Sequence, residues 1–234
     1  MSAKPNSIVV LTGAGISAES GIDTFRDAGG LWENHSVYDV ATPEGFARDP
    51  ELVLRFYDER RAALSKVKPN AAHIALARLE AEFSGDFLLV TQNVDDLHER
   101  GGSQKVCHMH GELKSALCTS CGTRSRWETD MLSRPPCPVC HAPTLRPDVV
   151  WFGEMPYQMA RIEAALATCD LFVSVGTSGA VYPAAGFVQQ AKGMGARTLE
   201  LNLEPSDGTA IFHEARHGPA GQLVPQWVEE VLSV

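Results

Sequence analysis

The sequence predicts an α/β fold, with a large domain built on a parallel sheet and a smaller domain made of helices and a zinc-binding module. Two observations predict this arrangement. Short apolar runs alternate with helical patterns along most of the chain, which is typical of an open and mostly parallel sheet. Two Cys-x-x-Cys pairs interrupt the alternation, and such pairs are typical of a zinc site. The 234 residues, 44% of them hydrophobic, suffice for both domains.

Each predicted element has a local signal. Strands are expected at short apolar runs, which are residues 8–11, 87–91, 171–175, 198–201 and 222–224. Helices are expected where apolar residues recur every three or four positions or where proline opens the pattern, which are residues 51–64, 71–82, 161–167 and 184–192. Polar or glycine-rich residues follow the first four strands. Since the carboxyl ends of parallel strands share one edge of a sheet, we expect these residues to meet in one crevice.

Two stretches do not follow the strand and helix alternation. Residues 33–70 have a helical pattern without a strand, and residues 113–148 contain the cysteine pairs. We interpret both as insertions that pack together as the small domain. The sheet domain then consists of residues 1–32, 71–112 and 149–234.

Charge and hydropathy exclude several classes of protein. Lys and Arg total 20 against 29 Asp and Glu, a net charge of −9, so the basic face of a nucleic-acid-binding protein is not expected. No apolar run approaches the ~18 residues of a membrane span, and the first residues lack a signal-peptide core. We therefore expect a cytoplasmic protein that contacts neither membranes nor nucleic acid directly.

Four of the six cysteines have the spacing of a structural zinc site. Cys118 and Cys121 form one pair, Cys137 and Cys140 form the other, and turn-forming residues surround both. Four thiolates close a tetrahedron and leave no position for a reactive water, so the ion is expected to be structural. Cys107 and Cys169 lie outside the pairs and are expected to be small buried residues.

A glycine-rich segment follows the first predicted strand. Gly13-x-Gly15-x-x-Ala18 fits the dinucleotide fingerprint, in which backbone amides approach a pyrophosphate; a tight turn without a ligand is the alternative. A dehydrogenase would place an acidic residue at the end of a second strand about 20 residues later. This sequence instead continues with glycines and polar groups over residues 20–32, a composition typical of a mobile cofactor lid.

The chain resembles the sirtuins, a family of NAD-dependent protein-lysine deacylases. The motifs occur in family order over almost the whole chain and are Gly13-Ala14-Gly15-Ile16-Ser17, Gly21-Ile22, Phe25-Arg26, Gln92-Asn93-Val94-Asp95, His110-Gly111, the cysteine pairs, Phe152-Gly153-Glu154 and Gly176-Thr177-Ser178. The resemblance implies a Rossmann-like domain, one structural zinc, and a cleft where NAD meets an acylated lysine. NAD is then consumed, with release of nicotinamide and 2′-O-acyl-ADP-ribose.

The resemblance also assigns expected roles. His110 would be the general base, a role that the neighbouring histidines His98 and His108 could fill on composition alone. The expected NAD-binding residues are Gly13, Ala14, Gly15, Ala18, Glu19, Phe25, Arg26, Trp32, Gln92, Asn93, Asp95, Gly176, Thr177, Ser178, Asn202, Leu203, Glu204 and Ala220. Phe152, Gly153 and Glu154 would pair with the substrate peptide as an added strand.

A second resemblance concerns the acyl group. Tyr57 and Arg60 share a helix face, and with Ala41 they match the pattern of the bacterial and mitochondrial sirtuins that remove succinyl and malonyl groups. A phenol beside a guanidinium can bind a carboxylate, although a core tyrosine and a solvated arginine would give the same spacing. Partners are then proteins carrying acetyl- or succinyl-lysine. Mono-ADP-ribosyl transfer and a non-enzymatic zinc-ribbon adaptor stay as alternatives.

Overall fold

The computed structural model describes residues 5–22, 31–32 and 35–233, with only the backbone at 31–32. Within these ranges no helix combines the length and the apolar character needed to cross a membrane.

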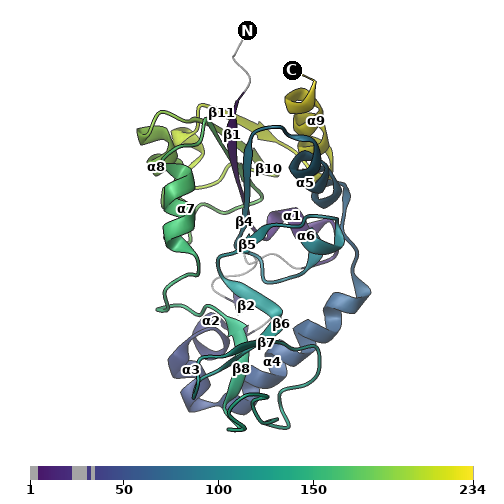
Figure 1. Ribbon diagram of the computed structural model, residues 1–234, viewed down its shortest axis with the longest axis vertical. Helices are drawn as coiled ribbons and strands as arrows, with labels where there is room; N and C mark the ends of the chain where they lie inside the picture. Colours follow the sequence, from purple (N-terminus) through teal and green to yellow (C-terminus); the bar gives the residue numbers. More distant parts are fainter. Residues whose placement is uncertain (1–4, 23–30, 33–34, 234) are drawn as a thin grey trace.

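A six-stranded sheet forms the centre of the larger part of the molecule (Figure 1). Its order is β11 (Glu214–His217), β10 (Arg197–Asn202), β9 (Leu171–Val175), β1 (Ser7–Thr12), β4 (Asp86–Thr91) and β5 (Val106–His108), and every pair is parallel. The chain leaves β1 toward β4 on one side and later returns to β9 on the other. A ligand crevice is expected at such a reversal of strand order, beyond the ends of β1 and β9.

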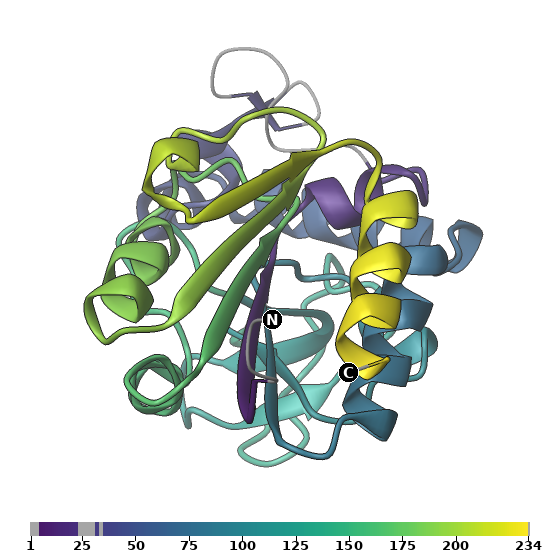
Figure 2. The same cartoon turned by 90° about the horizontal axis from the view of Figure 1, so that it is seen from above.

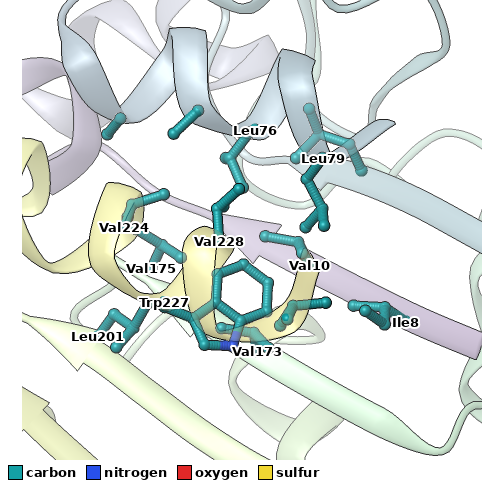
Figure 3. Close-up of a cluster of buried hydrophobic side chains, with 14 of the residues drawn as sticks. Ile8, Val10, Leu76, Leu79, Val173, Val175, Leu201, Val224, Trp227 and Val228 are labelled. Carbon is teal, nitrogen blue, oxygen red and sulfur yellow. The ribbon is translucent and has the colours of Figure 1, made fainter. Parts of the chain in front are cut away.

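Helices cover both faces of this sheet (Figure 2). On one face lie α5 (Ala71–Glu82) and α9 (Ala220–Leu232); on the other lie α7 (Met159–Leu166) and α8 (Phe187–Gly193). Figure 3 shows the first interface, where Trp227 and Val228 of α9 pack with Leu76 of α5 against Val10 and Val173 of the sheet. Helices thus bury the central strands from both sides, which explains why these strands are continuous apolar runs in the sequence.

The smaller part combines helices with a second sheet (Figure 1). Its helices are α2 (Val37–Val40), α3 (Pro43–Arg48) and α4 (Pro50–Ala63), followed by the 3-10 turn η1 (Leu64–Lys66). Its antiparallel sheet has the order β7 (Arg124–Arg126), β6 (Gly111–Cys118) and β8 (Leu145–Val149). Leu54 of α4 packs into the same core as Cys118 and Cys137, so the long helix and the cysteine module share buried surface.

The structure corrects three sequence predictions. Residues 222–224 belong to α9, so the apolar run there is helical and not a strand. The helix continues through Pro225, although proline disfavours a helix interior. The stretch 33–70 contains the two-residue strand β3 (His35–Ser36), paired with β2 (Leu31–Trp32). Strand β11 was absent from the prediction because it is a polar, exposed edge strand without an apolar run.

The other short elements connect these layers. They are α1 (Gly15–Ala18), α6 (Leu97–Arg100), η2 (Ala184–Gly186) and η3 (Thr209–Ile211). Helix α1 lies within the glycine-rich segment after β1 and so begins at the crevice.

Candidate functional site

A cavity of about 970 Å³ lies beyond the carboxyl ends of β1, β4, β9 and β10 and extends to α4 and to the loop after β8. It brings together most of the residues expected from the sequence. Those that line it are Gly13, Ala14, Gly15, Ala18, Glu19, Ala41, Tyr57, Arg60, Gln92, Asn93, Asp95, His110, Phe152, Gly153, Glu154, Gly176, Thr177, Ser178, Asn202, Leu203 and Ala220. The expectation that four strand ends meet in one crevice is therefore confirmed.

Four expected residues are not among the described residues that line the cavity. Phe25 and Arg26 lie outside the described residues, and at Trp32 only the backbone is described. Glu204 is described, but it is exposed and lies outside the cavity lining, on the segment that leaves β10 for the surface. The assignment of Glu204 to NAD binding therefore stays a prediction.

The glycines after β1 allow two loops to approach closely. A Cβ atom at Gly13 would lie 2.8 Å from the carbonyl oxygen of Gly176, and one at Gly15 would lie 2.8 Å from the Gly176 Cα. The amides of Gly13 and Gly15 donate to the carbonyls of Val175 and Gly176 at 3.0 and 2.8 Å. These two amides are thus used within the protein, and the reason for glycine at both positions is close packing between the ends of β1 and β9.

A buried polar network orders the middle of the cavity. Ser17 Oγ accepts a hydrogen bond from Asn93 Nδ2 and donates one to Asp95 Oδ2, both at 3.1 Å. The Asp95 carboxylate also accepts from the amide of Leu97 at 3.0 Å, and burial raises the pKa of this carboxyl. Ser17 is therefore the link that fixes the amide of Asn93, and only its place in the glycine motif gave a sequence signal.

Behind this network lie groups that the sequence prediction did not assign. Thr12 Oγ1 donates to Thr91 Oγ1 at 2.8 Å, and Thr91 Oγ1 accepts from the amide of Asn93 at 3.0 Å. Thr12 Oγ1 also lies 3.0 Å from Nε2 of His98, whose ring is 4.9 Å from that of His73. Burial lowers the pKa of His73 to about 4 and that of His98 well below its ordinary value, so both rings are neutral supports at physiological pH.

Of three nearby histidines, His110 alone reaches the cavity among the described lining residues. Its Nδ1 lies 3.2 Å from the carbonyl oxygen of Gln92; because a carbonyl can only accept, Nδ1 carries the proton and Nε2 is the basic atom. Burial lowers the pKa of His110, which keeps the ring neutral near pH 7. His108 instead bonds Glu99 at 2.7 Å and the carbonyl of Asn93 at 3.2 Å.

The far end of the cavity is formed by α4. Tyr57 is fully buried, and burial raises the pKa of its hydroxyl well above the ordinary value. Arg60 is 7% exposed; its Nη1 donates to the carbonyl of Phe56 at 3.1 Å, and its guanidinium carbon lies 3.4 Å from the centre of the Phe56 ring. The arginine is thus a buried cation and not the solvated one that the spacing also allowed.

The loop after β8 forms the wall between α4 and the strand ends. The amide of Phe152 donates to the carbonyl of Ala41 at 2.9 Å. The Glu154 carboxylate accepts from the amide of Trp151 at 2.9 Å and from Nη2 of Arg146 at 2.8 Å. Glu154 therefore holds the loop together, while the Phe152 side chain is exposed at the cavity.

The cysteine pairs are brought together as expected. The Sγ atoms of Cys118, Cys121, Cys137 and Cys140 all lie within 4.8 Å of one another. Cys118 Sγ is 3.6 Å from Cys140 Sγ, and Cys121 Sγ is 3.8 Å from Cys137 Sγ. Thiolates on a tetrahedral zinc with bonds of about 2.3 Å are separated by about 3.8 Å, so the donor set fits one closed zinc site.

The two remaining cysteines, Cys107 and Cys169, are buried as predicted.

Comparison with known proteins identifies the family. The Sir2 family model matches residues 13–183. The chain belongs to the Sir2 family. A Sir2 relative from Vibrio parahaemolyticus, named NAD-dependent protein deacylase, is 58% identical over 97% of this chain and 96% of its own length. The protein of the same name from Pasteurella multocida is 57% identical over 96% of this chain and 97% of its own length.

Solved structures of Sir2 proteins share the fold. The crystal structure of a Sir2 homologue in complex with NAD has a TM-score of 0.89 at 39% identity, covering 98% of this chain and 90% of the other. A Sir2 protein bound to an acetylated peptide has a TM-score of 0.82 at 29% identity, covering 97% and 93% of the two chains. The sirtuin resemblance and the predicted fold class are therefore confirmed.

Proposed function

We propose that this Sir2 protein is an NAD-dependent protein-lysine deacylase that removes succinyl and malonyl groups as well as acetyl groups. One observation carries the proposal: a single cavity joins the strand-end crevice to the buried pair Tyr57 and Arg60, with His110 on its wall. A dinucleotide and an acylated lysine can therefore meet inside one enclosed space.

The crevice has features that suit NAD. It lies beyond the carboxyl ends of β1 and β9, where the strand order reverses, and the ordered Asn93 side chain offers an amide to a carboxamide. When bound, NAD supplies the ribose carbon that the acyl oxygen attacks as nicotinamide leaves. His110 is suited to accept a proton from a ribose hydroxyl through Nε2, because Nδ1 is already engaged by Gln92.

The acyl end of the cavity favours a carboxylate. Arg60 is a buried cation that lines this end of the cavity, and a guanidinium can bind a carboxylate through two parallel hydrogen bonds. The raised pKa of Tyr57 keeps its hydroxyl protonated, so that it can donate a hydrogen bond to the same carboxylate. Ala41 adds little bulk beside the pocket and leaves room for a four-carbon acyl group.

Matched acetyl- and succinyl-lysine peptides test this proposal. Replacing Arg60 with Met should lower kcat/KM for the succinyl peptide at least tenfold, because a buried charged hydrogen bond is lost, and should spare the acetyl peptide. Arg55→Met is the matched control on the same helix, since Arg55 is exposed and forms an ion pair with Glu51 within α4. Mass spectrometry with and without NAD gives the readout.

Three outcomes would contradict the proposal. Deacylation that persists without NAD would refute the mechanism, and equal loss of both activities in Arg60→Met would refute the pocket assignment. Nicotinamide release without any change in peptide acylation would favour mono-ADP-ribosyl transfer. The proposed partners are proteins that carry acyl-lysine. The proposed location is the cytoplasm, where the zinc-binding thiols stay reduced.

A further inference from the structure

Trp151 and Tyr57 form a hydrogen bond between the loop after β8 and helix α4. The indole Nε1 of Trp151 lies 3.0 Å from the Tyr57 hydroxyl oxygen. Trp151 is 2% exposed and Tyr57 is fully buried, so water does not compete for this contact. Ninety-four residues separate the two in sequence.

The direction of this hydrogen bond is fixed by chemistry. An indole nitrogen is only a donor, so the Tyr57 oxygen must be the acceptor. The phenolic hydrogen of Tyr57 is thereby directed to an acceptor other than Trp151. Since Tyr57 lines the same cavity as Arg60, the acyl end of that cavity is where an incoming carboxylate can receive the hydrogen.

Trp151 is itself held from several sides. Its amide donates to Glu154 Oε2 at 2.9 Å, and its ring lies 3.9 Å from the guanidinium carbon of Arg146. Arg146 Nη2 donates to the same Glu154 oxygen at 2.8 Å, and the Phe46 ring lies 5.2 Å from the indole. These contacts leave the indole little freedom, which is what a group that orients another side chain requires.

We propose that Trp151 is a positioning residue for acyl selectivity: its indole N–H holds the Tyr57 hydroxyl so that the phenolic hydrogen is delivered to the carboxylate of a succinyl or malonyl group. The inference rests on the proposed function and adds a residue that does not itself bind the acyl carboxylate.

Conservative ring substitutions test the inference. Trp151→Phe keeps an aromatic ring beside Arg146 and Phe46 but removes the N–H donor. We expect a roughly tenfold lower kcat/KM for the succinyl peptide, mainly through KM, and less than about a twofold change for the acetyl peptide. The double variant with Tyr57→Phe should be no worse than Tyr57→Phe alone. Trp151 acts only through the Tyr57 hydroxyl, which Tyr57→Phe already removes.

Trp227→Phe is the matched control, because Trp227 is also buried but packs in the core between α9 and the sheet and is not among the described lining residues of the cavity. It should lose stability without a change in the ratio of succinyl to acetyl activity. A second measurement uses the wild-type enzyme with 15N-labelled tryptophan: the indole signal that is perturbed in Tyr57→Phe should shift on binding the succinyl peptide and not the acetyl peptide. This measurement holds even if Trp151→Phe does not fold.

The outcomes separate this inference from the proposed function. If the wild-type enzyme removes no succinyl group, the proposed function fails. If it does, and Tyr57→Phe loses that activity, equal effects of Trp151→Phe on both peptides would overturn only the inference. Full additivity of the two substitutions, or an indole signal that responds equally to both peptides, would overturn it as well.

Discussion

Asp58 and Arg61, neighbours on one face of α4, form a buried ion pair of 2.6 Å. Both side chains also form hydrogen bonds that join the helix to other segments, including the one between the two cysteine pairs. The Asp58 carboxylate accepts from the amides of Met131 and Leu132 at 2.8 and 3.0 Å. Arg61 Nε donates to the carbonyl of Leu113 at 2.8 Å. The helix that carries Tyr57 and Arg60 is therefore anchored to the zinc-binding part of the molecule by two side chains that are not among the described lining residues of the cavity.

Replacing Asp58 with Ala should destabilise the protein strongly. Arg61 would be left as a buried charge and the amides of Met131 and Leu132 would lose their acceptor; breaking a buried pair in this way typically costs about 3 to 5 kcal/mol. Glu51→Ala is the control, because the Arg55–Glu51 pair is exposed on the same helix and should contribute less than about 1 kcal/mol. Urea denaturation gives both values, and equal losses would show that the buried pair does not anchor α4.

The strands of the large sheet could be predicted because burial on both faces requires continuous apolar runs. Residues 171–175 match β9 at both ends, and helix 71–82 matches α5. Strand β11 and the strands of the small sheet could not be predicted in this way, because they are short, exposed or interrupted by a bulge. At residues 222–224 the apolar run suggested a strand, but these residues form part of helix α9, whose buried side chains pack on the sheet.

The site was predictable where a motif follows a strand, as at Gly13, Gln92 and Gly176. Contacts between distant segments left no such pattern. The hydrogen bond between Trp151 and Tyr57 and the contact between His73 and His98 depend on how α4, α5 and the loops pack. Such packing leaves no local spacing pattern in the sequence. The sequence thus predicted residues that line the cavity but not those that support them.

Loss of zinc should weaken the smaller part of the molecule and the acyl pocket with it. Cys137 is buried beside Leu54 of α4, so a disordered cysteine module would open the core under that helix. Cys137→Ser should abolish binding of the one zinc ion per chain and lower the melting temperature. Cys169→Ser is the control, because Cys169 is also buried but lies in the other part. Metal analysis would contradict the assignment if Cys137→Ser retained a full zinc equivalent.

The pH dependence of deacylation should identify which histidine is the base. Because burial lowers the pKa of His110, its neutral form prevails from below pH 6.5 upward. The value of kcat/KM should therefore rise with pH through a midpoint below 6.5 and then level off. His110→Ala should remove this acidic limb and lower the plateau about 100- to 10,000-fold, the range typical of a lost general base.

His108 would give the opposite shift. Burial of His108 lowers its pKa, but the hydrogen bond and the charge of Glu99 outweigh burial, and the net pKa is raised. If His108 were the base, the acidic limb would have its midpoint above 6.5 and would move on replacing Glu99 with Gln. Measuring kcat/KM from pH 5 to 8 for the wild type, His110→Ala and Glu99→Gln therefore distinguishes the two, and a midpoint above 6.5 that depends on Glu99 would rule out the assignment of His110.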